Sequence, residues 1–99
     1  MSLSFAPAAI RELLEAEDWY EQQKIGLSRR FLDDLYACAD RIQQHPMAYR
    51  LIARNLRRAS LSSFPYYLLF RLWNDSIEVV VVAHASRRPA YWSDRVSQV

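Results

Sequence analysis

Residues 60–86 read SLSSFPYYLLFRLWNDSIEVVVVAHAS, and this stretch decides the fold. Two runs rich in aromatic and β-branched residues flank Asn74 and Asp75. That pattern predicts two central strands joined by a tight hairpin turn. If the loop has two or four residues, Leu72 faces Ile77, and the same register extends along both strands.

This register gives the predicted hairpin two different faces, because side chains alternate across a sheet. One face is wholly apolar and carries Tyr66, Leu68, Phe70, Leu72, Ile77, Val79, Val81 and Ala83. The other face is mixed and carries Tyr67, Leu69, Arg71, Trp73, Glu78, Val80, Val82 and His84. The apolar face must be covered by other elements, whereas the mixed face suits a binding site. Arg71 and Glu78 are expected to form a cross-strand ion pair.

The first half of the chain predicts two helices that can supply this cover. Residues 7–24 place apolar side chains at helical spacing behind Pro7, which suits a first helical turn. Gly26 suits the left-handed position between helices, and Ser28 is expected to cap a second helix that ends near His45. Two helices with a short connection form an antiparallel hairpin.

Three further segments complete the predicted order. Residues 2–6 alternate weakly and predict a short strand at a sheet edge, and residues 56–61 predict a third strand of the meander. Residues 86–99 predict a short helical or irregular tail. The fold class is therefore α+β: a short N-terminal strand, then an antiparallel two-helix hairpin packed on a small antiparallel β-sheet.

Length and composition limit the class of protein. Ninety-nine residues, 52% of them hydrophobic, suffice for one core, so residues 1–99 are expected to form a single domain. The lone Cys38, the lack of a signal-peptide pattern and the lack of a long apolar run predict a cytoplasmic protein with no membrane association. There is no glycine-rich phosphate loop and no metal-binding pair of Cys or His residues, so no cofactor or metal is expected.

Charge is distributed unevenly along the chain. Residues 1–48 hold five basic and eight acidic residues, a net charge of −3, whereas residues 49–99 hold eight basic and three acidic residues, a net charge of +5. The basic half is compatible with nucleic acid or with an acidic protein partner.

Several segments together resemble the RelE/ParE superfamily of bacterial type II toxins. They are ELLEAEDWYEQQ, RRFLDDL, LRRASLSSFPYYLLFR and VVVVAHASRRPAYWSDR, in that order along the chain. The resemblance implies an α+β toxin that is neutralised by a cognate antitoxin protein. It leaves two targets open, because one branch poisons DNA gyrase without an enzymatic site and the other cleaves mRNA on the ribosome.

Proton-transfer chemistry distinguishes these branches. Cleavage of RNA without a metal needs a base, an acid and cations around the phosphate, and arginine can be only a cation. His84 and Tyr91 are the candidate catalytic residues if the chain is a ribonuclease. Alternatively, His84 forms a structural hydrogen bond at the end of its strand. The only lysine, Lys24, lies in the helical half, and this weakens the nuclease interpretation.

The remaining candidate residues are surface contacts. A target-binding or nucleic-acid-binding patch is expected to comprise Arg57, Arg58, Arg87, Arg88, Trp92 and Arg95. Antitoxin binding is assigned to Trp19, Arg57 and Arg58, although Trp19 could instead pack against the tail. A gyrase-directed, non-enzymatic toxin is the favoured hypothesis. A RelE-like ribosome-dependent mRNA endonuclease and a degenerate toxin that only binds its antitoxin are the alternatives.

Overall fold

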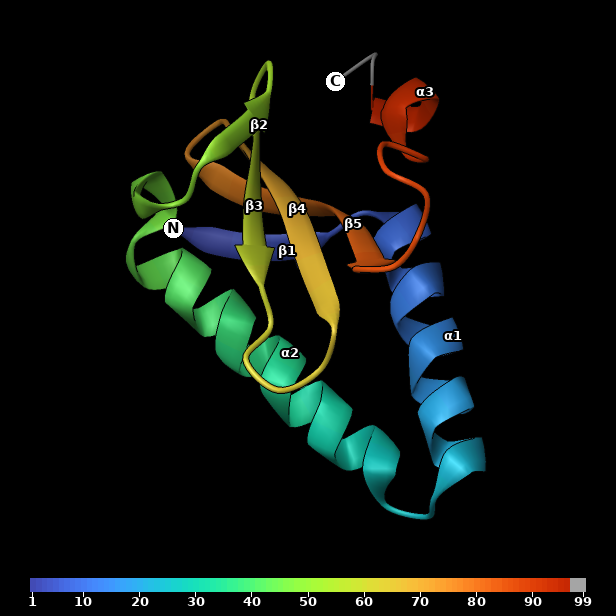
Figure 1. Ribbon diagram of the computed structural model, residues 1–99. Coiled ribbons are helices and arrows are strands. Elements are labelled where there is room, and N and C mark those ends of the chain that lie inside the picture. The colour runs from blue at the N-terminus through green and yellow to red at the C-terminus, as the bar shows by residue number, and fades with distance from the viewer. Residues whose placement is uncertain (97–99) are drawn as a thin grey trace.

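A five-stranded mixed sheet forms the centre of the computed structural model, which describes residues 1–96. The strands are ordered β1-β5-β4-β3-β2 across the sheet (Figure 1). They are β1 (Ser2–Phe5), β2 (Leu51–Ala53), β3 (Leu56–Ser60), β4 (Tyr66–Trp73) and β5 (Ser76–His84). Strand β1 runs parallel to β5, and the other pairs are antiparallel. The edge strand and the β3-β4-β5 meander are therefore confirmed.

Two helices, α1 (Pro7–Gln23) and α2 (Leu27–Gln44), cover one face of the sheet and spread as a V from the turn that joins them (Figure 1). Gly26 adopts the expected left-handed conformation at φ 89°. The predicted cap at Ser28 is wrong, because the Ser28 hydroxyl donates to Glu21 Oε1 at 2.7 Å. This bond and the N–H groups of Gly26 and Ser28 lower the pKa of the Glu21 carboxyl. Glu21 therefore fixes the turn between the helices.

Short elements complete the chain. A 3₁₀ turn, η1 (Pro46–Ala48), precedes β2, and α3 (Ser93–Val96) follows an irregular segment after β5. Strand β2 lies within a segment that the sequence predicts only as a connection. The predicted tail is confirmed up to residue 96, and its residues 97–99 lie outside the described part of the chain. No helix within residues 1–96 is long and apolar enough to cross a membrane.

A β-bulge corrects the predicted hairpin register. Leu72 faces Ile77 and Arg71 faces Glu78 as expected, but Val80 is an extra residue, and from there Leu69 faces Val81. One inserted residue reverses every later side chain on its strand. Residues 81–84 therefore lie on the faces opposite to those predicted.

The bulge gives the sheet two buried faces. Towards the helices, Val82 joins the larger core, which is built from these buried residues: Ala9, Leu13, Ala16, Tyr20, Phe31, Leu35, Cys38, Ile42, Ala59, Leu61, Leu68, Phe70, Ile77 and Val79. On the other face a smaller core holds Leu56, Tyr67, Leu69, Val80, Val81, Ala83 and Val96. Tyr91 and Trp92 pack against this smaller core from the C-terminal segment. The face predicted as a binding site is thus partly a core covered by the tail.

Candidate functional site

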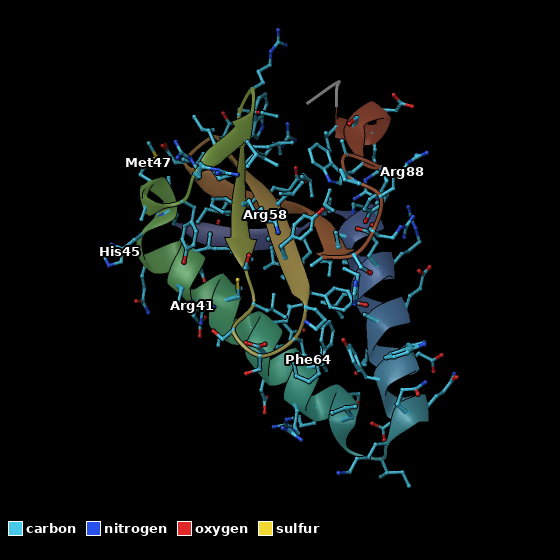
Figure 2. All side chains as sticks on the ribbon, in the orientation of Figure 1. Arg41, His45, Met47, Arg58, Phe64 and Arg88 are labelled. Carbon is cyan, nitrogen blue, oxygen red and sulfur yellow. The ribbon has the colours of Figure 1, made fainter. Side chains whose placement is uncertain are left out.

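The two arginines of β3 point to opposite sides of the sheet. Arg57 donates from Nη1 to the Tyr49 carbonyl at 2.6 Å, which ties it to the segment after α2. Arg58 stacks on the ring of Tyr67, with 3.9 Å from its Cζ atom to the ring centroid. Figure 2 shows Arg58 over the middle of the sheet, on the face away from the helices. Of this pair, only Arg58 is therefore presented on the open face.

His84 lies on the helix-covered side of the sheet, as a consequence of the bulge. It faces Tyr66 across β4, and the two rings pack edge to face at 5.1 Å. Its Nδ1 atom is 3.0 Å from the Ser86 N–H and 2.7 Å from the Ser86 hydroxyl. A backbone N–H can only donate, so Nδ1 accepts in this geometry and the ring proton belongs on Nε2. His84 therefore makes the structural hydrogen bond that the sequence offers as the alternative to a catalytic role, and its partner is Ser86.

The Tyr91 hydroxyl donates to Glu12 Oε2 at 2.6 Å. Burial raises the pKa of Tyr91 well above its ordinary value, and the bond to the carboxylate raises it further. Arg87 stacks on the Tyr91 ring, with its Cζ atom 4.0 Å from the ring centroid. The hydroxyl is held as a hydrogen-bond donor, which makes it a poor group for transferring protons near neutral pH.

Glu12 is the centre of the polar contacts around the tail. Besides Tyr91, its carboxylate accepts from the Val82 N–H at 3.0 Å and from both terminal nitrogens of Arg95, at 3.2 and 3.0 Å. Arg95 also donates to the Val80 carbonyl at 2.8 Å. Glu12 and Arg95 satisfy backbone groups of β5 beyond the end of β1, where this edge of β5 has no neighbouring strand among the described residues. Nothing in the sequence singles out Glu12, because its partners follow it by 70 to 83 positions.

A cavity of about 280 Å³ opens between α1 and the end of β5. It brings together four predicted residues, which are Trp19 of α1, His84 of β5, and Arg87 and Tyr91 of the segment after β5. The arginines of β3 do not line it, and neither do Arg88, Trp92 or Arg95. The candidate proton-transfer residues are therefore separated from most of the candidate cations.

The predicted tail patch is also divided by the fold. Trp92 donates from Nε1 to the Tyr67 hydroxyl at 3.3 Å and packs on the smaller core, so it is a structural residue. Arg95 is held by Glu12, whereas Arg88 is exposed and extends away from the sheet (Figure 2). A second groove of about 450 Å³ runs between the β2–β3 hairpin and α3, and Ile52 and Leu56 are among the residues that line it.

Comparison with known proteins identifies the family of this chain. The family model described as the ParE toxin of the type II toxin-antitoxin system parDE matches residues 3–89. No curated protein matches the chain.

Solved structures share the fold. The chromosomal ParDE toxin-antitoxin system from P. aeruginosa matches with a TM-score of 0.77 and 18% identity, covering 87% of this chain and 97% of that chain. The isolated E. coli RelE toxin matches with a TM-score of 0.61 and 22% identity, covering 98% and 96% of the two chains. The intact E. coli RelBE toxin-antitoxin complex gives 0.60 and 21%, covering 87% and 98%. At these identities the likeness shows the fold, and the family model adds the family: this chain belongs to the ParE toxins of type II toxin-antitoxin systems.

Proposed function

We propose that this toxin acts by binding DNA gyrase and that it does not cut mRNA. The observation that carries the proposal is the separation of proton-transfer groups from cations. His84 and Tyr91 line the cavity beside α1, whereas Arg58 lies on the open sheet face and Arg57 is bonded to the Tyr49 carbonyl. Membership of the ParE family supports the same branch.

The cavity itself is poorly suited to a phosphodiester. Metal-free cleavage needs cations close to the phosphate to stabilise its extra charge. Among residues 1–96, Arg87 is the one arginine that lines the cavity, and two carboxylates, Glu12 and Glu15, line it as well. The Tyr91 hydroxyl is already bonded to Glu12, so it does not offer the cavity a free acid. Because Arg95 pairs with Glu12, and Glu15 offsets the charge of Arg87, an RNA strand would meet no net positive charge here.

Binding by a surface requires only exposed groups. We assign the gyrase contact to the exposed arginines after β5, Arg87 and Arg88, because Trp92 and Arg95 are held by the fold. We also propose that a cognate antitoxin neutralises the toxin. The groove beside the short edge strand β2, with Arg54 at its rim, suits a partner segment that combines apolar and acidic side chains.

Growth assays with matched variants test the proposal. We expect His84→Gln to leave growth inhibition intact, because His84 makes a structural bond and no catalytic one. Arg88→Glu should weaken inhibition strongly, whereas Arg30→Glu makes the same change of charge at an exposed position on α2 and should not. Trp92→Ala is not informative, because it removes part of the smaller core.

The same cells should be examined for cleaved transcripts by primer extension. Codon-dependent cleavage that disappears in His84→Gln would contradict the proposal and support the endonuclease alternative. Equal loss of inhibition in Arg88→Glu and Arg30→Glu would place the target contact elsewhere.

A further inference from the structure

The cavity beside α1 has a rigid aromatic wall. Trp19 packs edge to face on Tyr20 at 5.1 Å, and Tyr20 contacts Tyr66 at 6.1 Å and Phe64 at 4.9 Å. Trp19 itself is 56% exposed. These ring contacts fix the wall before any ligand arrives, and preorganisation of this kind lowers the cost of binding.

The wall also carries unused polar groups. Tyr20 is only 8% exposed, and its hydroxyl has no hydrogen-bond partner among residues 1–96. Within that part of the chain, no fully buried side-chain oxygen lacks a partner, so this hydroxyl reaches solvent, and Tyr20 lines the cavity. The Tyr66 hydroxyl is equally unpartnered there, and burial raises the pKa of both tyrosines, so both stay neutral.

A carboxylate lines the same cavity as these tyrosines. Glu15 lines the cavity and has no partner among the described residues, unlike Glu12, whose two oxygens are occupied. Aromatic faces together with a carboxylate attract a cation, and the hydroxyls add hydrogen-bond acceptors. One such contact already exists in this protein, because the Arg87 guanidinium stacks on the Tyr91 ring and both residues line the cavity.

We propose that this cavity is a binding site for an arginine side chain of a protein partner. The guanidinium stacks on the Trp19 ring, one edge donates to the Glu15 carboxylate, and the other donates to the tyrosine hydroxyls. This geometry uses the planar, five-donor shape of the group, which a lysine lacks. The inference does not depend on gyrase being the target, because it rests on the cavity alone.

Nuclear magnetic resonance with a small probe tests the site directly. The purified toxin is titrated with N-acetyl-arginine methylamide, and the indole N–H signals are followed at constant ionic strength. We expect saturable shifts of the Trp19 signal. Trp73 is an internal control, because it is equally exposed at the far end of the hairpin and Arg71 already lies over its ring. The uncharged analogue N-acetyl-citrulline methylamide should bind much more weakly.

Three variants sharpen the test. Glu15→Gln should weaken probe binding about tenfold, since a charge-assisted bond becomes a neutral one. Tyr20→Phe should weaken it by a smaller factor while the ring wall remains. Arg87→Gln should strengthen it by removing a like charge from the rim.

Other outcomes would overturn the inference. Equal shifts of Trp19 and Trp73 would show nonspecific stacking of arginine on exposed indoles. Saturable binding of N-acetyl-glutamate methylamide in place of the arginine probe would make this an anion site organised by Arg87 and His84. Unchanged affinity in Glu15→Gln would remove the carboxylate from the site.

Discussion

Replacing Glu12 by glutamine should loosen the C-terminal segment from the body of the toxin. The Glu12 carboxylate accepts from the Val82 N–H, the Tyr91 hydroxyl and the Arg95 guanidinium. A glutamine side chain keeps one acceptor oxygen, but its amide nitrogen can only donate, so at least one donor must lose its partner.

The size of the effect follows from these contacts. Loss of a hydrogen bond to a charged group costs about 1.5–3 kcal/mol. The ion pair with Arg95 adds only about 0–1 kcal/mol, because the Arg95 side chain is 34% exposed. We therefore expect Glu12→Gln to lower the free energy of unfolding by about 1.5–4 kcal/mol, a large fraction of the stability of a small protein.

Urea unfolding measures the total loss of stability, and hydrogen exchange shows which part of the chain loses protection. The amides of Tyr91, Arg95 and Val96, which bond within the C-terminal segment, should exchange faster in Glu12→Gln than in the unchanged protein. Glu15→Gln is the matched control, because it removes the same charge from α1 at a residue that has no partner within residues 1–96. If both variants unfold at the same urea concentration, the reasoning about Glu12 is wrong.

Three further predictions concern other parts of the chain. Asp34 accepts from three backbone N–H groups of the β3–β4 loop. Burial raises its pKa, but these bonds and the nearby charge of Arg41 together hold it below its ordinary value. Its stabilising effect should be fully present above about pH 4 and be lost as the pH falls through the native pKa, so Asp34→Asn should flatten the acid limb of stability measured by urea unfolding while exposed Asp33→Asn does not. Val81→Ala and Val82→Ala should each cost about 2 kcal/mol in urea unfolding, because the bulge buries the two side chains in different cores; a loss in only one of them would mean that one face is not packed. Arg58, which the sequence assigns to antitoxin binding, lies on the open face. Arg58→Glu should therefore slow association with an acidic antitoxin in stopped-flow mixing and leave dissociation nearly unchanged. An unaffected association rate would show that the antitoxin does not contact Arg58.

Local sequence patterns were sufficient to predict most of the fold. Periodicity located both helices, and the hairpin around Asn74 predicted the Arg71–Glu78 ion pair, which forms at 2.8 Å. Alternation cannot reveal a bulge, however, because an extra residue in a run of four valines leaves the apolar pattern unchanged. The predicted position of His84 was wrong for this reason.

The candidate site could be predicted only in part, because it depends on contacts between residues that are far apart in the chain. The sequence marked Trp19, His84 and Tyr91 by residue type, but it did not predict that one cavity joins them. It assigned Trp92 and Arg95 to a contact patch, whereas their bonds to Tyr67 and Glu12 make them part of the tail's attachment. Such roles depend on partners distant in the chain, which no local spacing indicates.

A gyrase supercoiling assay with purified toxin tests the central claim most directly. Relaxed plasmid, gyrase and ATP are mixed with increasing toxin, and translating ribosomes with a defined mRNA are treated with the same preparation. We predict that the unchanged toxin and His84→Gln inhibit supercoiling equally, that Arg88→Glu inhibits much less, and that none of them cuts the mRNA. Undiminished supercoiling together with codon-dependent cleavage of the mRNA would contradict the account.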